Sequence, residues 1–222
     1  LEQSKTEPAM LAPRLLQRTL NPYSKADIRY TPTIEESIER AKAVTYEQVA
    51  QLYREYLGSQ SGELTLVGDF SEAACLKVLE KPLAGWKAGK TYARIASPII
   101  AEVPASQQTI NTPDKANATF TAGLLFPMSD DDPDYPALVM GNYILGSGTL
   151  SSRLGTRVRQ KEGLSYGITS SLGVSSQDER ASFSISAIVN PDNIQKLQAC
   201  ALEEVDRLLR DGVTAGELDK AR

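Results

Sequence analysis

Two alternating segments, residues 164–174 and 181–189, constrain the fold of this chain more than any other feature. The polar residues 175–180 between them predict a turn, so the two segments form an antiparallel hairpin. Residues 190–212 follow, and their apolar side chains recur at helical spacing. Because a hairpin is not stable alone in water, we expect this long helix to pack on it.

The other segments are grouped by type, with helices mainly before a linker and strands mainly after it. Before residue 85, capping residues and apolar spacing predict helices at 9–20, from Thr33, from Thr45 to Gly58 and from Ser71 to about residue 80, with one strand at residues 63–67. After the linker we expect strands at 107–112 and 117–126, a helix from Asp132 to Gly146, and a helix at 150–162 closed by Gly163. Such segregated runs are typical of the α+β class, an antiparallel sheet with helices packed on one face.

The domain organisation follows from a change in composition at residues 85–106. Glycine, proline and small residues are frequent there, which predicts a linker between two domains. We therefore divide the chain into residues 1–90, a linker at residues 91–106, and residues 107–222.

Two features suggest that the structure extends beyond this segment or pairs with a second chain. Thr214 and Glu217 form a capping box that opens a helix, and the chain stops after about two turns. We expect the chain to be an internal segment of a longer protein, with any targeting signal outside it. The strand at residues 63–67 has an unpaired edge, which recruits another strand. We expect it to join the sheet of residues 107–189, within the chain or by exchange between two chains of a homodimer.

The absence of histidine excludes several kinds of catalytic site. None of the 222 residues is histidine, so no Ser-His-Asp or Cys-His pair and no zinc site with a histidine ligand can form within this chain. The two cysteines, Cys75 and Cys200, lie far apart in segments that read as helical, which also excludes a cysteine metal site. We expect no cofactor in this chain. The cysteines leave the compartment open between periplasm and cytoplasm.

Charge and hydropathy exclude two further classes of partner. The net charge is −4 and no block of basic residues occurs, so we expect no binding to nucleic acid. No apolar run approaches the roughly 18 residues of a membrane span.

Two short motifs suggest ligands that their spacing does not support. Residues 85–91 resemble a phosphate-binding loop, but three residues separate the glycines where that loop needs four. The aspartates at positions 130–134 lack the spacing of a calcium-binding loop, and acidic residues at a helix N-terminus are explained by capping. We interpret the first as part of the linker and the second as a helix start.

The most informative stretch runs from residue 151 to residue 171. Arg159 lies one turn before the end of the predicted helix, and Tyr166 lies on the strand that returns from it. A reversal at Gly163 can bring the two side chains to one rim, where they could donate hydrogen bonds to a carbonyl oxygen or an oxyanion. The alternative is a surface arginine and a sheet tyrosine without function. Gly146, Ser147 and Gly148 are either a simple connection or a mobile loop beside a binding groove.

This stretch resembles the insulinase/pitrilysin family of zinc peptidases, which includes mitochondrial processing peptidase. The matching residues are Ser-Ser-Arg-Leu at 151–154, Arg-x-Lys-Glu-Gly-Leu-x-Tyr at 159–166, Ile-Leu-Gly-Ser-Gly at 144–148, Tyr-Glu-Gln-Val at 46–49 with Tyr53 and Tyr56, Leu-Val-Gly-Asp-Phe at 66–70, and Trp86. Together they extend over most of the chain from about residue 32, in a specific order and spacing.

The resemblance implies repeated α+β halves, of the metallohydrolase-like type found in the processing peptidases, that enclose a peptide-binding chamber. One half carries zinc, and the other is zinc-less and supplies an arginine and a tyrosine to the active site. Arg159 and Tyr166 are similar to that catalytic pair, and Gly146, Ser147 and Gly148 to the glycine-rich, substrate-binding loop of the zinc-less half. Residues 1–90 then resemble the end of one half, and residues 107–222 the start of the next, truncated at its C-terminus.

Three functions are compatible with the resemblance. The first is a fragment of a zinc endopeptidase that binds a peptide or protein substrate but lacks the metal, with the zinc-bearing half upstream in the parent protein. The second is the zinc-less subunit of a heterodimeric peptidase, with zinc on the partner subunit. The third is a structural relative without proteolytic activity, as in respiratory-complex core subunits. In each case we expect this chain to be inactive alone.

Overall fold

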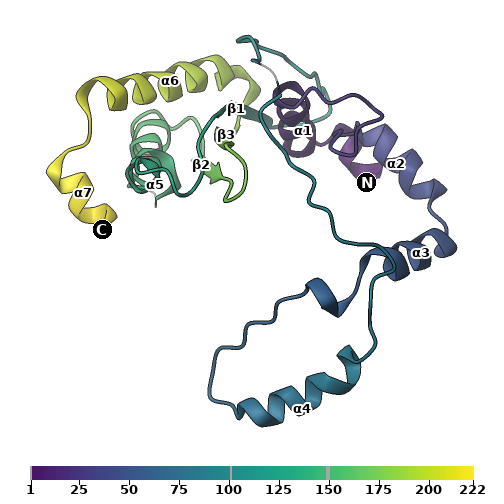
Figure 1. Cartoon of the computed structure of the whole chain (residues 1–222). Helices are drawn as coiled ribbons and strands as arrows, with labels where there is room; N and C mark the ends of the chain where they lie inside the picture. Colours follow the sequence, from purple (N-terminus) through teal and green to yellow (C-terminus); the bar gives the residue numbers. More distant parts are fainter. Residues whose placement is uncertain (1, 101, 149–150) are drawn as a thin grey trace. The chain divides into compact units, whose positions relative to one another are not determined.

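The computed structural model describes residues 2–100, 102–148 and 151–222 (Figure 1). The chain divides into two compact units. The larger unit combines residues up to 38 with residues 96–222, and the smaller unit consists of residues 39–95. The organisation expected from the sequence, with halves at 1–90 and 107–222 joined by residues 91–106, stays a prediction.

The larger unit is built on one three-stranded antiparallel sheet in the order β1-β3-β2. Its strands are β1 (Ala118–Phe126), β2 (Ile168–Val174) and β3 (Ala181–Val189). β2 and β3 form the predicted hairpin, and β1 pairs with the other edge of β3 so that Ala118 lies opposite Val189. The α+β class predicted from the sequence is confirmed.

Several helices accompany this sheet. They are α1 (Pro8–Leu20), α2 (Ile34–Ala43), α5 (Tyr135–Asn142) with the π-helical turn η3 (Tyr143–Ser147), the π-helical segment η4 (Gly155–Lys161), α6 (Ile194–Asp211) and α7 (Ala215–Ala221). Of these, α2 crosses the boundary of the unit at residue 38. Short 3₁₀ turns at Glu2–Thr6 and Pro191–Asn193 precede α1 and α6. α1 packs on β1, where Leu16 Cδ2 would lie 3.1 Å from a Cβ built on Gly123.

The hydrophobic core lies between the sheet, α6 and η4. It consists of Leu145, Leu154, Val158, Leu164, Ile168, Ile185, Ala187, Val189, Leu197, Cys200 and Ala201. These residues come from the hairpin, from the long helix after it, from the 151–171 stretch and, in the case of Leu145, from η3. The predicted packing of residues 190–212 on the hairpin is therefore confirmed, and the core fixes the position of the segment that carries the candidate site. Both cysteines are free thiols.

Capping residues predicted the helix ends well. Thr45 and Thr214 form complete capping boxes with Gln48 and Glu217. Gly212 follows α6 with a φ of 69°, a left-handed conformation that side chains with a Cβ rarely adopt. Each of these residues satisfies backbone groups that a helix leaves without partners.

Two predicted strands do not form among the described residues. Residues 107–112 contain a single apolar side chain larger than alanine, Ile110, so they offer no apolar face to bury. Residues 63–67 form no strand in the described structure, and the sheet of the larger unit consists of β1, β2 and β3. The expected pairing of residues 63–67 with that sheet, within the chain or by exchange between two chains, stays a prediction.

Three predicted boundaries also move. The helix expected from Asp132 begins at Tyr135, because Asp132 Oδ1 instead accepts a hydrogen bond from the Asp134 N–H in the preceding turn. The same helix continues through Gly146 as η3 and ends at Ser147, with Gly148 as its C-cap. The helix expected at 150–162 is η4 in its described part, and its predicted first residue, Leu150, lies outside the described residues.

The smaller unit contains α3 (Tyr46–Tyr56), a 3₁₀ turn at Ser59–Ser61, and α4 (Glu72–Leu83). Trp86 stacks on Tyr53 with ring centroids 5.9 Å apart. The Gly89 N–H donates to the Arg54 carbonyl at 3.0 Å, so the start of the predicted linker lies along α3.

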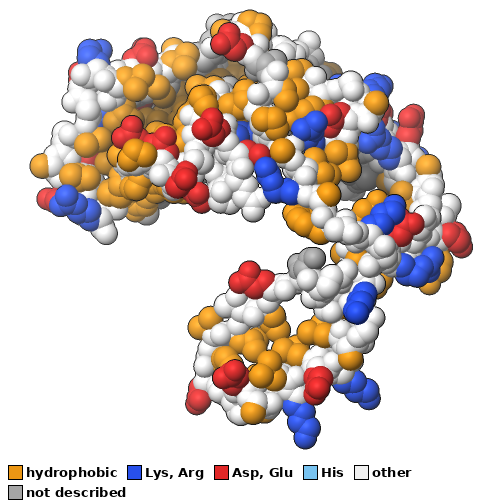
Figure 2. All heavy atoms as spheres, viewed as in Figure 1, with side chains coloured by type: hydrophobic (Ala, Val, Ile, Leu, Met, Phe, Trp, Pro, Cys, Tyr) orange, Lys and Arg blue, Asp and Glu red, His pale blue; other side chains and the backbone are white. Residues whose placement is uncertain are grey.

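The smaller unit has no buried core. None of its described residues is buried, and Figure 2 shows hydrophobic side chains open to solvent in the part of the molecule that contains α4. Four apolar side chains of α3 are each more than half exposed: Val49, Leu52, Tyr53 and Tyr56. Across the described residues, no helix combines the length and apolar character needed to cross a bilayer.

Candidate functional site

One groove in the larger unit brings together all the residues predicted for the catalytic pair and the substrate-binding loop. It has a volume of about 730 Å³ and lies between η3, η4 and the start of β2. Its lining includes Gly146, Ser147, Gly148, Arg159 and Tyr166. The reversal predicted at Gly163 has a φ of 61°, and it brings the end of η4 back beside β2. The sequence therefore predicted which residues line the groove, and their function stays a prediction.

The glycines of the groove allow close contact between η3 and β2. A Cβ on Gly146 would lie 2.6 Å from Ser170 Oγ and 2.7 Å from Ser170 N. Ser170 is 1% exposed, and its hydroxyl donates to Asn142 Oδ1 at 2.7 Å. A Cβ on Gly148 would lie 2.6 Å from the Tyr143 carbonyl oxygen, which accepts the Gly148 N–H. Packing alone therefore requires glycine at both positions.

Arg159 is held on a helix that is fixed at both ends. At its start, the buried Ser152 accepts a hydrogen bond from the Gly155 N–H at 3.2 Å. At its end, the Leu164 N–H donates to the Val158 carbonyl at 2.9 Å. Val158 faces the core, and the Arg159 side chain next to it is exposed.

Tyr166 projects from a bend between the end of η4 and β2. Its side chain is 94% exposed, whereas Leu164, Ser165 and Ile168 around it are buried. Within the described chain, neither Arg159 nor Tyr166 makes a side-chain hydrogen bond or ion pair. Both side chains are therefore free to donate to a ligand in the groove.

Other charged residues of the same motif have structural partners instead. Glu162 accepts from Lys196 Nζ at 2.9 Å and lies 3.3 Å from Arg157 Nη1, which ties the end of η4 to α6. The contact with Lys196 lowers the pKa of Glu162. Arg157 also binds Glu203 at 2.9 Å. Among the arginines at positions 153, 157 and 159, only Arg159 is left without such a partner in the described chain.

Arg153 joins the groove helix to the C-terminal helix. Its Nε and Nη2 atoms bind the two oxygens of Glu217 at 2.6 and 2.8 Å, and Nη2 also donates to the Gly212 carbonyl. The Thr214 N–H donates to the same carboxylate at 2.8 Å. These contacts, with Arg153 first, lower the pKa of Glu217 from 4.5 to about 2.

Sequence reasoning missed three serines that support the groove: Ser152, Ser165 and Ser170. All are buried, and each hydroxyl bonds to a neighbouring segment or helix end. Ser170 carried a signal in the sequence, because it occupies an inward position between Ile168 and Leu172 where the alternation calls for an apolar residue. A buried polar side chain needs a hydrogen-bond partner.

Comparison with protein families shows the family to which this chain belongs. The model of the peptidase M16 inactive domain matches residues 43–222. The chain belongs to this family. The resemblance to an insulinase-like, zinc-less C-terminal region is thereby confirmed.

Solved structures agree with this assignment of the M16 inactive domain. A peptidase M16 inactive domain from Pseudomonas fluorescens is 27% identical, with a TM-score of 0.83 over 99% of this chain and 51% of that chain. A protease from Helicobacter pylori shares the fold at 18% identity, with a TM-score of 0.74 over 99% of this chain and 52% of that one. A predicted insulinase family protease from Yersinia pestis shares it at 14% identity, with a TM-score of 0.55 over 96% and 43%.

The chain spans about half the length of the first two of these structures. Comparison with curated proteins gave no match.

The donor set of this M16 inactive domain does not fit zinc. The chain has no histidine, and no group of three or more cysteine, aspartate or glutamate side chains in its described residues could hold a metal ion. We therefore expect the isolated chain to retain no stoichiometric zinc after dialysis and to cleave no peptide when zinc is added. Metal analysis of the dialysed protein checks this, and one tightly held zinc per chain would contradict it.

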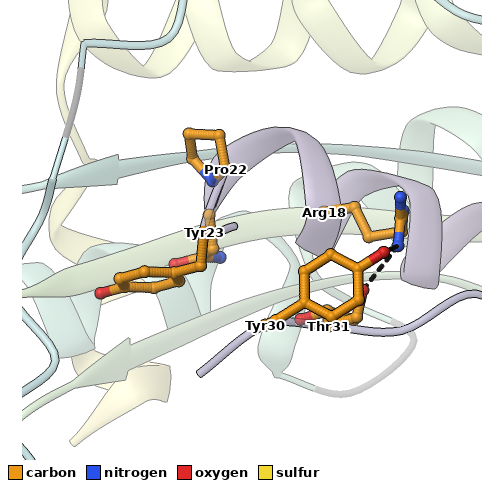
Figure 3. Close-up of a pocket in the computed structure, with 6 residues that line it drawn as sticks. Arg18, Pro22, Tyr23, Tyr30 and Thr31 are labelled. Atoms are coloured by element: carbon orange, nitrogen blue, oxygen red, sulfur yellow. Dashed lines mark hydrogen bonds between the residues drawn. The ribbon is translucent and has the colours of Figure 1, made fainter. Parts of the chain in front are cut away.

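A smaller cavity of about 270 Å³ near the end of α1 has a structural explanation (Figure 3). Arg18 Nη1 donates to Tyr30 Oη at 2.9 Å and to the Thr31 carbonyl at 2.6 Å. Tyr30 Oη in turn donates to Glu36 Oε2 at 2.8 Å. The polar groups around this cavity thus bind one another and fasten the loop after α1.

The Arg153–Glu217 contact predicts a stability effect that depends on pH. Because the folded pKa of Glu217 lies below its ordinary value, its contribution is complete above pH 4.5 and is lost as the pH falls towards 2. Discounted for partial exposure, we expect Glu217→Gln to lower the free energy of unfolding by about 2 kcal/mol at pH 6. Urea unfolding of both proteins from pH 6 to pH 2 measures the difference, which should shrink with acid.

Asp219 on the same helix provides the matched control. Its side chain is 75% exposed and lies 3.9 Å from Arg222. We expect Asp219→Asn to change the free energy of unfolding by less than about 0.5 kcal/mol at any pH. Equal effects of the two substitutions would show that Glu217 contributes no specific contact.

Proposed function

We propose that this M16 inactive domain is the non-metal half of an insulinase-like zinc endopeptidase. In this proposal its groove binds the peptide, and Arg159 and Tyr166 reach the scissile carbonyl. The observation that carries the proposal is the convergence of both side chains on one groove together with the 146–148 turn. Neither side chain has a partner among the described residues, which supports the proposal.

The two side chains suit the recognition of a peptide carbonyl. The Arg159 guanidinium offers several N–H donors in a fixed plane, and the Tyr166 hydroxyl offers one more donor. Donors already aimed at the position where negative charge develops lower the energy of the transition state. In the proposed role, both groups would hold the substrate carbonyl and stabilise the oxyanion formed from it.

The metal and the general base must then come from elsewhere, because the residues of this chain do not fit zinc. The length of the solved relatives, about twice that of the region matched, leaves room for a zinc-bearing half in the parent protein. A partner subunit is the alternative source. In both arrangements the substrate is a peptide or protein, and the zinc-bearing half is the partner of this chain.

Arg159→Lys in the intact peptidase tests the proposal. Lysine keeps the charge but loses the planar set of donors, so we expect kcat/KM to fall at least tenfold. Arg210→Lys is the matched control, because Arg210 is an exposed arginine on α6 whose ion pair is with its neighbour Asp211. Steady-state kinetics of both variants, beside thermal melts, measures the effect.

Normal activity of Arg159→Lys would contradict the catalytic role of Arg159 and favour the alternative of a surface arginine without function. A loss of activity that a lower melting temperature explains entirely would lead to the same conclusion. Activity that requires a separately encoded zinc-bearing subunit would instead support the heterodimeric form of the proposal.

A further inference from the structure

The bend that carries Tyr166 is fastened by one buried hydroxyl. Ser165 is 8% exposed, and its Oγ lies 2.6 Å from the Ile188 carbonyl oxygen and 2.8 Å from the Gly167 carbonyl oxygen. The Gly167 N–H donates to the same Oγ at 3.1 Å. The hydroxyl has one proton, so it donates to one carbonyl at a time and accepts from Gly167.

These bonds occur where the regular pairing of β2 with β3 stops. The last paired residues of this ladder are Ile168 and Ala187, and the next carbonyl along β3 belongs to Ile188. The Ser165 side chain takes the place of a backbone donor at this position. The chain can therefore leave the sheet at Gly167 while the Ile188 carbonyl keeps a hydrogen-bond donor.

The rest of the bend gives Tyr166 little support of its own. The Tyr166 side chain is 94% exposed and has no partner within the described chain. Gly167, the residue that follows, has no atom within 4 Å of a Cβ built on it, and glycine is the least restricted residue. Local rigidity at Tyr166 thus depends on the Ser165 hydroxyl and on the buried Leu164 before it.

We infer that Ser165 is a positioning residue, which holds the Tyr166 hydroxyl at the groove by bonding the bend to the end of β3. This inference rests on the proposed function for its catalytic consequence, but the positioning itself is a property of the chain. Ser165 acts through Tyr166 and does not contact the substrate.

The positioning is tested first without any activity. The full chain is labelled with 3-fluorotyrosine, and the ¹⁹F resonance of Tyr166 is identified by its loss in Tyr166→Phe. In Ser165→Ala we expect this resonance to sharpen and to move towards that of the free amino acid, because the ring becomes more mobile. Ser182→Ala is the control, since its exposed hydroxyl also bonds a backbone carbonyl, that of Gly173, away from the bend. An unchanged Tyr166 resonance in Ser165→Ala would overturn the inference.

A double-mutant cycle in the intact peptidase tests the catalytic consequence. We expect Ser165→Ala to lower kcat/KM about tenfold in the wild type but less than twofold in Tyr166→Phe, because nothing is left to position. A loss of folded protein would affect both backgrounds equally and would cancel from the comparison. Ser165→Cys, which is nearly the same size but a weaker donor, serves as a second variant if the alanine variant does not fold.

The outcomes separate the two claims. Suppose that Ser165→Ala lowers kcat/KM equally in the wild type and in Tyr166→Phe, and that Tyr166→Phe alone also lowers kcat/KM. This result would overturn the role of Ser165 and leave the proposed function standing. Normal activity of Tyr166→Phe would overturn the proposed function, and the ¹⁹F measurement would still decide whether Ser165 holds the bend.

Discussion

Replacing Tyr166 by phenylalanine is expected to lower kcat and kcat/KM of the proposed zinc endopeptidase together, by about a hundredfold, with KM little changed. The reason is that a donor used mainly in the transition state contributes on the order of 3 kcal/mol there and little to ground-state binding. The free energy of unfolding should barely change, because the side chain is 94% exposed and its hydroxyl has no partner within the described chain.

Tyr92→Phe is the control for this measurement, since Tyr92 is 72% exposed and lies outside the groove lining. Its kinetics should match those of the wild type. Steady-state kinetics and a thermal melt of each variant show whether the loss of activity is specific to Tyr166. A Tyr166→Phe enzyme with near-normal kcat would remove this residue from the proposed catalytic pair.

Gly146→Ala is expected to lower the free energy of unfolding of the chain by about 3 kcal/mol. The added Cβ would lie 2.6 Å from Ser170 Oγ, 2.7 Å from Ser170 N and 2.8 Å from Leu154 Cδ1. The backbone nitrogen of β2 cannot rotate away as a side chain can, so η3 and β2 must separate. The hydrogen bond from Ser170 to Asn142 would be strained by the same movement.

Gly141→Ala, in α5, gives the matched comparison. No atom lies within 4 Å of a Cβ built there, so we expect this substitution to raise the free energy of unfolding by about 0.5–1 kcal/mol. Urea unfolding of the two variants and the wild type measures both changes. If Gly146→Ala were as stable as Gly141→Ala, the close contact between η3 and β2 would not be important for stability.

The parts of the fold that were predictable from sequence depend on local chemistry. The capping boxes at Thr45 and Thr214 and the glycine after α6 act within a few residues, so the sequence around them is sufficient. The hairpin of β2 and β3 was also predictable, because its alternation and its turn are contiguous.

The parts that failed depend on partners distant in sequence. Residues 63–67 alternate as a strand should, but a strand needs a neighbour, and the described residues of the smaller unit contain no strand to pair with them. β2 begins at Ile168, four residues later than expected. The reason is that the Ile188 carbonyl bonds to the Ser165 hydroxyl instead of to a backbone N–H of a longer β2. Contacts of this kind cannot be found from periodicity.

The candidate site was predictable to a different extent. Arg159 and Tyr166 were singled out from the spacing around Gly163, and they do line one groove. The sequence alone does not show which charged residues of the motif form ion pairs within the chain. Glu162 is bound by Lys196, whereas Arg159 has no such partner in the described chain.

The lack of a core in residues 39–95 has a consequence for calorimetry and denaturant titration. Both the heat capacity change and the denaturant m-value scale with the surface that becomes exposed on unfolding. Residues 39–95 already expose their apolar side chains, so they contribute little to either quantity. Transitions of this chain therefore report on the larger unit, and the m-value should correspond to a protein shorter than 222 residues.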